Sequence, residues 1–113
     1  MQVDDLKPQP QCTIRFLWSS LDYAPQAAGC YVLATFDKKV LYVGLASSDI
    51  RSRMRSHLQD PNKIASPGIG MPFWFFFIEA PSQSVNSIER GWLHECLLAD
   101  GQWPVFNEAD SQL

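Results

Sequence analysis

The stretch that decides the fold reads GCYVLATF at residues 29–36, DKK at 37–39 and VLYVG at 40–44. Its first and last segments are rich in valine and tyrosine, which favour β-strands. The polar link between them is too short for a crossover connection, so the two strands are predicted to pair as an antiparallel hairpin. The rest of the domain is expected to add one strand and two helices to this hairpin.

Those three elements follow in order. Asp49 and the two serines before it offer helix N-caps, and the apolar spacing from Ile50 to Leu58 predicts a helix. The continuous aromatic and apolar run from Phe73 to Ile78 is typical of a strand covered on both faces. A second helix is expected from about Val85 to Ala99, where Asp100 and Gly101 stop it.

The resulting order, β-β-α-β-α, predicts an α+β fold (α/β in the broad sense) with a three-stranded antiparallel sheet flanked by helices. The 113 residues suffice for a single domain. Its core is expected from about residue 13 to 108, with loose ends at 1–11 and 109–113. Residues 13–24 are expected to form a short helix or turn, and the proline-containing stretch 61–72 a loop.

Several classes of protein are excluded at this level. The apolar run Phe73 to Ile78 is far shorter than the roughly 18 residues that cross a bilayer. The first eleven residues lack a signal-peptide pattern, so no membrane association is expected. Cys12, Cys30 and Cys96 form no CxxC pair and are odd in number. They are therefore predicted to be reduced thiols in a cytoplasmic protein.

Charge is distributed unevenly along the chain. The whole sequence carries a formal charge of −3, which argues against a basic nucleic-acid-binding surface. Between Lys38 and Lys63, however, six basic residues stand against two acidic ones, for a net charge of +4. The remaining residues sum to −7. Any contact with nucleic acid is therefore expected to be small and centred on the basic segment.

The first helix lies within that segment. On a helical wheel its buried stripe consists of Ile50, Met54 and Leu58. Arg53 and His57 lie together on one flank of the stripe, and Arg51 and Arg55 lie on the other. For Arg51 and Arg55 a solvated helix face is one interpretation, and contact with phosphate is the other.

The second helix contains an acidic residue within its apolar arc. Glu89 falls between Leu93 and Cys96 on the wheel. An ionised carboxylate in such a place needs a partner. Glu89 would form a salt bridge to a nearby arginine, cap a loop, be protonated, or bind a metal ion such as Mg²⁺. His94 and Glu95 lie on the polar side of this helix.

An ordered set of residues resembles the GIY-YIG endonuclease superfamily over about residues 29–107. Gly29-Cys30-Tyr31 matches its first motif, with Cys in place of the usual Ile or Val, and Tyr42-Val43-Gly44 matches its second. Arg53 and His57 match the arginine and histidine of its first helix, although Arg51 and Arg55 compete with Arg53 for this role. Glu89 matches the glutamate of its second helix, and Asn107 matches its closing asparagine.

The resemblance implies a metal-dependent DNA endonuclease that hydrolyses phosphodiester bonds, with a role in DNA repair or processing. The catalytic set would be Tyr31, Tyr42, Arg53, His57 and Asn107. Glu89 would hold one Mg²⁺ or Mn²⁺ ion, and Tyr31 would act as the base with its pKa lowered by that cation. Asn107 would fix the backbone of the site or Glu89 rather than act on substrate. DNA would also meet four further basic residues: Arg51, Arg55, Lys38 and Lys39.

Two other interpretations remain open from the sequence. The chain could be a GIY-YIG-like module that binds nucleic acid or protein without cutting, or a small α/β domain in which Glu89 forms a salt bridge and the tyrosines only pack. Family nucleases often carry a separate DNA-binding region, for which this chain lacks the length. A second protein, or self-association, is therefore expected to supply part of the DNA-binding surface.

Overall fold

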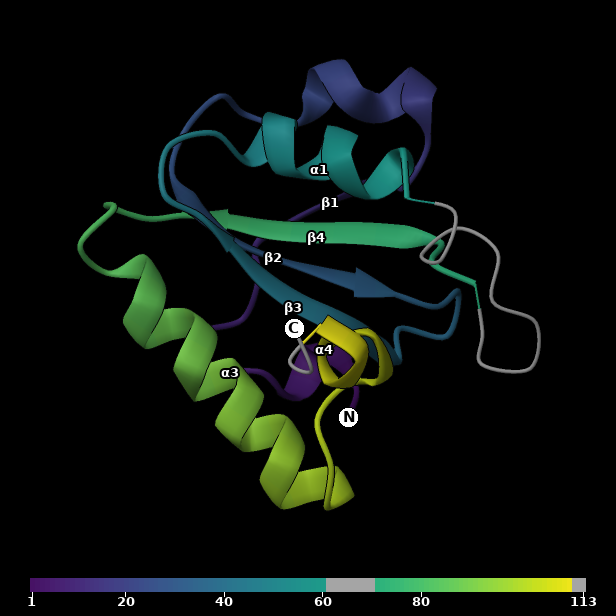
Figure 1. The fold of residues 1–113 in the computed structure, drawn as a ribbon, viewed down its shortest axis with the longest axis vertical. Helices are drawn as coiled ribbons and strands as arrows, with labels where there is room; N and C mark the ends of the chain where they lie inside the picture. The colour runs from purple at the N-terminus through teal and green to yellow at the C-terminus, as the bar shows by residue number, and fades with distance from the viewer. Residues whose placement is uncertain (61–70, 111–113) are drawn as a thin grey trace.

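The protein is built on a four-stranded antiparallel sheet with the strand order β1-β4-β2-β3 (Figure 1). The structure is a computed structural model that describes residues 1–60 and 71–110. The strands are β1 (Cys12–Arg15), β2 (Gly29–Ala34), β3 (Val40–Ala46) and β4 (Trp74–Glu79). The antiparallel α+β architecture is as predicted, but the sheet has four strands where three were expected.

Helices cover both faces of this sheet (Figure 1). On one face lie α1 (Ile50–Leu58) and the 3₁₀ segment η2 (Trp18–Tyr23). On the other face lie α3 (Val85–Asp100) and the N-terminal segment with the short η1 (Val3–Asp5). The last helix, α4 (Val105–Asp110), packs beside β3 at the edge of the sheet.

The predicted hairpin is confirmed as β2 and β3. Tyr31 pairs with Gly44 and Leu33 with Tyr42 in an antiparallel register. The connecting turn contains Lys38 in the left-handed region at φ 69°, which is uncommon for a residue other than glycine. β2 ends at Ala34, two residues earlier than predicted, and β3 continues two residues further to Ala46.

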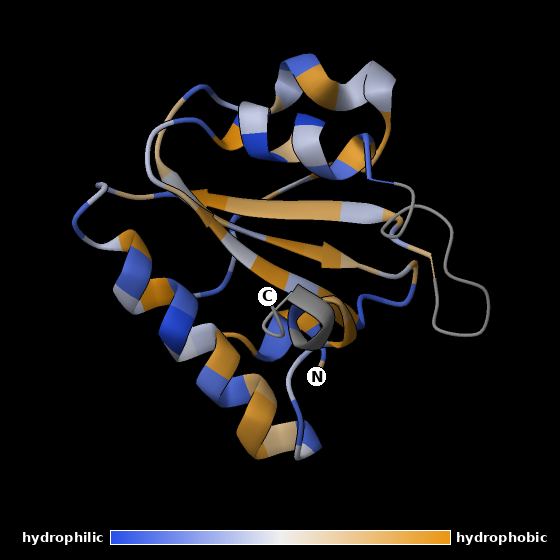
Figure 2. Ribbon diagram, viewed as in Figure 1, coloured by the Kyte–Doolittle hydropathy of each residue, from blue (hydrophilic) through white to orange (hydrophobic). Residues whose placement is uncertain are grey.

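The aromatic strand β4 is buried on both sides because it runs between β1 and β2 with a helical layer on each face. Phe75 and Phe77 point into the core under α1, and Phe76 points into the core under α3. Figure 2 shows β2 and most of β4 as hydrophobic, whereas hydrophobic and hydrophilic residues alternate along α3. The prediction that this strand is covered on both faces is confirmed.

The sequence-based prediction of residues 1–24 is wrong in two places. Residues 12–15 form β1, which pairs with β4 from Cys12↔Phe77 to Arg15↔Trp74, while the turn-like character expected further on is found in η2. The N-terminus is not loose, since Val3 and Leu6 are buried under α3. Four residues are too few to show a strand period, and the short N-terminal segment is held by tertiary contacts alone.

Local signals set the helix ends. The Asp49 carboxylate accepts a hydrogen bond from the Ser52 backbone N–H, so Asp49 caps α1 as predicted. Gly101 ends α3 in the left-handed conformation at φ 73°. The short helix α4, which begins at Val105, was not predicted. The predicted loop at 61–72 lies almost entirely outside the described residues.

Within the described ranges, no helix is long and apolar enough to span a membrane.

Candidate functional site

A polar hollow of about 310 Å³ opens where β3, α1 and α3 meet. Its lining combines a tyrosine, an arginine and a glutamate with the end of β3: Tyr42, Leu45, Ala46, Ser47, Arg53 and Glu89. Three of the predicted site residues, separated by up to 47 positions in the sequence, therefore share one cavity. The structure brings them together because the hairpin, the first helix and the second helix converge at this end of the sheet.

A second group of predicted residues lies directly beside the hollow. The Tyr31 hydroxyl oxygen is 2.7 Å from His57 Nε2 and accepts a hydrogen bond of 3.3 Å from Arg53 Nε. Tyr31 is fully buried and His57 is 4% exposed. Arg53 therefore connects the buried Tyr31–His57 pair with the hollow that it lines itself.

Aromatic rings fix this arrangement. The His57 ring lies edge-on to Tyr42 at a centroid distance of 4.8 Å, and Tyr31 stacks on Phe75 at 5.2 Å. The hairpin register brings Gly44 beneath both tyrosines, where an added Cβ would stand 2.5 Å from the Tyr31 ring and 2.8 Å from the Tyr42 ring. Glycine at position 44 thus allows the two rings to approach each other.

We expect the substitution Gly44→Ala to destabilise the protein by about 1–3 kcal/mol, because the new methyl group must displace packed rings. Gly91→Ala is the matched control, since no heavy atom of the described residues lies within 4 Å of a Cβ at that helical position. It should stabilise the protein by up to about 1 kcal/mol. Urea unfolding of both variants measures the difference, and equal stabilities would contradict the packing described here.

Burial determines the ionisation of Tyr31. It raises the pKa of the phenol, the nearby Tyr42 adds to this effect, and the Arg53 guanidinium offsets it only partly. The lowered pKa implied by the resemblance was assigned to a bound cation, whereas the protein's own groups act in the opposite direction. A phenol in this environment gives up its proton only to an acceptor in direct contact, and His57 Nε2 is in that position.

Glu89 is the acidic group of the hollow. Burial raises the pKa of its carboxyl, and the Arg90 and Arg53 guanidinium groups counteract this in part. Among the residues that the structure describes, none forms a hydrogen bond or ion pair with this carboxylate. The salt bridge considered from the sequence is therefore absent within that part of the chain. Such a half-buried carboxylate offers an oxygen ligand to a hard cation on the cavity side.

The implied Mg²⁺ ion can be tested against this donor set. Within residues 1–60 and 71–110, no group of three or more His, Cys, Asp or Glu side chains gathers as a metal cage. Mg²⁺ often uses one or two carboxylates and completes its shell with water and substrate phosphate. Glu89 fits this second mode, in which the protein provides a single anchoring carboxylate.

Asn107 has a structural position. Its side-chain oxygen accepts a hydrogen bond from the Val43 backbone N–H at 2.7 Å, and its side-chain nitrogen donates to the Val43 carbonyl at 2.8 Å. Asn107 therefore satisfies both backbone groups of Val43 on the outer strand of the sheet. This agrees with the expectation that it fixes backbone, and it holds Tyr42 and Gly44 in register.

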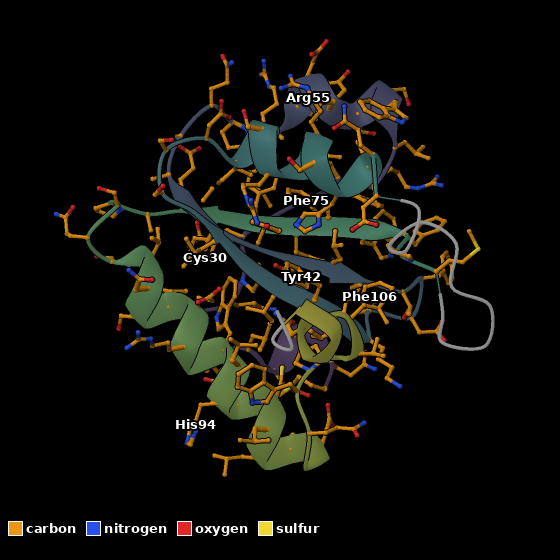
Figure 3. All side chains as sticks on the ribbon, in the orientation of Figure 1. Cys30, Tyr42, Arg55, Phe75, His94 and Phe106 are labelled. Atoms are coloured by element: carbon orange, nitrogen blue, oxygen red, sulfur yellow. The ribbon has the colours of Figure 1, made fainter. Side chains whose placement is uncertain are left out.

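The other basic residues lie away from the hollow. The Arg51 guanidinium donates to the carbonyls of Ala24 and Asp22, so it ties α1 to the loop before β2. Arg55 points away from the sheet (Figure 3). Lys38 and Lys39 lie in the hairpin turn, at the opposite end of β3 from Ser47. Of the three arginines that competed in the sequence, only Arg53 lines the cavity.

Cys30, which stands where the motif usually has Ile or Val, connects β2 with α3. Its side chain lies on the opposite face of β2 from Tyr31, and its thiol donates to the Val85 carbonyl at 3.2 Å. This contact ties β2 to the start of α3, four residues before Glu89. Burial raises the pKa of the Cys30 thiol to about 12. All three cysteines are free thiols, as predicted.

Sequence reasoning missed Leu45, Ala46 and Ser47 as walls of the hollow. They follow Gly44 directly, so the extension of β3 by two residues would have indicated them. Comparison with known proteins adds no family, because no protein-family model matches the chain and a search of curated proteins finds no relative.

Proposed function

We propose that this protein is a metal-dependent endonuclease of the GIY-YIG type that hydrolyses DNA phosphodiester bonds in the hollow between α1, α3 and β3. The observation that carries the proposal is the meeting of Arg53, Glu89 and Tyr42 in one cavity, beside the Tyr31–His57 pair. Motif order in the sequence predicts that these residues act together, and their place in and beside one cavity supports the proposal.

The residue chemistry suits an anionic substrate. Arg53 offers a permanently charged fork to a phosphate oxygen, and its pKa is raised further by the adjacent Tyr31 hydroxyl. Glu89 would hold one Mg²⁺ or Mn²⁺ ion, which when bound neutralises charge on the phosphate and on the leaving 3′ oxygen. Tyr42 is 8% exposed and lines the cavity. Its hydroxyl would orient the phosphate or the attacking water.

The attacking water must lose a proton. Because burial raises the pKa of Tyr31, the phenol would accept that proton only while passing its own proton to His57 Nε2 across the 2.7 Å contact. In this scheme His57 is in the tautomer whose Nδ1 carries the hydrogen, which leaves Nε2 as the acceptor. Tyr31 and His57 thus work as one unit.

We expect Tyr31→Phe to slow cleavage by about a hundredfold to ten-thousandfold, since it removes a general base, while the fold is retained. His57→Gln should have a similar effect, and the double variant should be little worse than either single variant because the residues act together. Single-turnover cleavage rates measure this. Additive losses would show that the two side chains act independently.

The proposal is tested by incubating the purified protein with Mg²⁺ or Mn²⁺ and single-stranded, branched and continuous duplex DNA, with EDTA in parallel. We expect metal-dependent cleavage of at least one substrate. If no DNA is cut, the chain is a binding module of the same fold. Cutting only in the presence of a second protein would place the missing DNA-binding surface on that partner.

We further propose that the protein works in the cytoplasm, where its free thiols stay reduced.

A further inference from the structure

A larger groove shares a wall with the hollow. It has a volume of about 570 Å³ and is lined mainly by one side of α3 and the segment that follows: Glu89, Arg90, Leu93, His94, Leu97, Trp103 and Asn107. Glu89 lines both cavities. From Glu89 to Leu97 the helix rises by about 12 Å, so the groove leads from the hollow along α3 toward Trp103.

The lining of this groove is divided by chemistry. Leu93, Leu97 and Trp103 form its apolar part, and both Leu97 and Trp103 remain about two-fifths exposed, at 40% and 39%. Arg90 and His94 bring the basic groups, and both are exposed. An aromatic and aliphatic surface beside a guanidinium and an imidazole matches one nucleotide, with a flat base on the apolar part and its phosphate on the N–H donors of Arg90 and His94.

Trp103 is held at a fixed place relative to the hollow. Gly101 ends α3 two residues before it, and α4 begins two residues after it. Asn107, which also lines the groove, is bonded to Val43 of β3. The segment that carries Trp103 is therefore anchored to the same strand that carries Tyr42.

We propose that this groove binds an unpaired nucleotide adjacent to the scissile phosphate, with its base stacked on Trp103. The inference rests on the proposed function, because the groove adjoins the proposed cleavage site through the shared residue Glu89. A base that stacks on a protein side chain has left its duplex. The preferred substrate is then single-stranded DNA, or a junction with an unpaired base beside the cut, and continuous duplex is disfavoured.

The test measures binding and cutting separately. The probe for binding is a fluorescein-labelled oligodeoxythymidine in EDTA, followed by anisotropy. Trp103→Ala should weaken its binding about tenfold or more, as loss of one stacked base does. Trp103→Phe keeps an aromatic face and should bind nearly as the wild type does. Trp18→Ala, at an exposed tryptophan of η2 outside the groove, is the matched control and should leave binding unchanged.

Each result leads to a different conclusion. Equal affinities of the wild type and Trp103→Ala, or no binding of the oligonucleotide by the wild type, would overturn the stacking site. Binding that depends on Trp103, in a protein that cuts no DNA with Mg²⁺ or Mn²⁺, would instead overturn the nuclease and leave the stacking site intact. If Trp103→Ala cleaves DNA at a single-stranded junction more slowly than the wild type does, but cleaves continuous duplex at the wild-type rate, the result would support both the stacking site and the nuclease.

Discussion

Glu89→Gln is expected to reduce DNA cleavage by about a thousandfold or more while leaving the protein folded, because it removes the carboxylate proposed to anchor the metal ion and keeps the shape of the side chain. Glu89→Ala should lose activity equally. Undiminished metal-dependent nicking by either variant would rule out Glu89 as the metal ligand.

The same variant should change stability in a direction that a purely structural glutamate would not. Burial raises the carboxyl pKa of Glu89 in the folded protein. Such a carboxyl stabilises the fold fully below its unfolded pKa, near 4.3, and this contribution is lost as pH rises through the folded pKa. At pH 7 the charged Glu89 therefore disfavours the folded state, and Gln should not.

Thermal unfolding in EDTA checks this sign. At pH 7 we expect Glu89→Gln to unfold at the same temperature as the wild type or at a higher one, and this advantage should shrink as pH falls and disappear by about pH 3, where Glu89 is protonated in both states. If Glu89 served a salt bridge, the variant would instead be less stable at pH 7. Loss of activity together with unchanged or increased stability is characteristic of a residue held in place for function.

The three arginines of α1 should give three different phenotypes. Arg53→Ala is expected to slow cleavage by about a hundredfold or more, because it removes the cation that lines the hollow. Arg53→Lys should restore little, since a lysine has no second nitrogen to bond Tyr31 while it faces phosphate. Cleavage rates at saturating protein measure both.

The neighbouring arginines are matched controls two positions away on the same helix. Arg51→Ala should lower the free energy of unfolding by about 1–3 kcal/mol, because its bonds to the Ala24 and Asp22 carbonyls are lost, and should keep the cleavage rate of the folded fraction. Arg55→Ala should keep both stability and cleavage rate, and reduce the salt dependence of binding only if Arg55 meets a phosphate. A loss of cleavage with Arg55→Ala comparable to that with Arg53→Ala would contradict the assignment.

Where sequence reasoning succeeded, a local signal was reinforced by the tertiary structure. The hairpin followed from a three-residue link between valine-rich segments, and α1 from its apolar spacing and the Asp49 cap. For Gly44 the sequence indicates only its place in the Tyr42-Val43-Gly44 motif, whereas the structure places it inside β3 with two tyrosine rings over it.

Where it failed, the decisive contacts are long-range. β1 is four residues long and is defined by pairing with β4, whose paired residues lie 59 to 65 positions away. The burial of Val3 and Leu6 depends on α3, which a local pattern cannot reveal. The raised pKa of Tyr31 was missed for the same reason, because the sequence gives no measure of how completely α1 and β4 enclose the phenol.

The choice among Arg51, Arg53 and Arg55 was likewise open in the sequence. Helical spacing put Arg53 on the same flank as His57. Only the packing of α1 on the sheet shows that Arg53 lines the cavity, whereas Arg51 bonds the carbonyls of Ala24 and Asp22. The groove beside Trp103 had no sequence signal at all, since it arises from the placement of α4 beside α3.

The central claim is that a water molecule attacks a DNA phosphate in the hollow of Arg53 and Glu89. Single-turnover cleavage in H₂¹⁸O, followed by mass spectrometry of the products, tests it most directly. Attack by water with departure of the 3′ oxygen leaves one ¹⁸O atom on the new 5′-phosphate and a 3′-hydroxyl without label. We expect this pattern with Mn²⁺ or Mg²⁺ and its loss with Glu89→Gln. A 5′-phosphate without ¹⁸O, or the same labelled products from Glu89→Gln at the wild-type rate, would contradict the account.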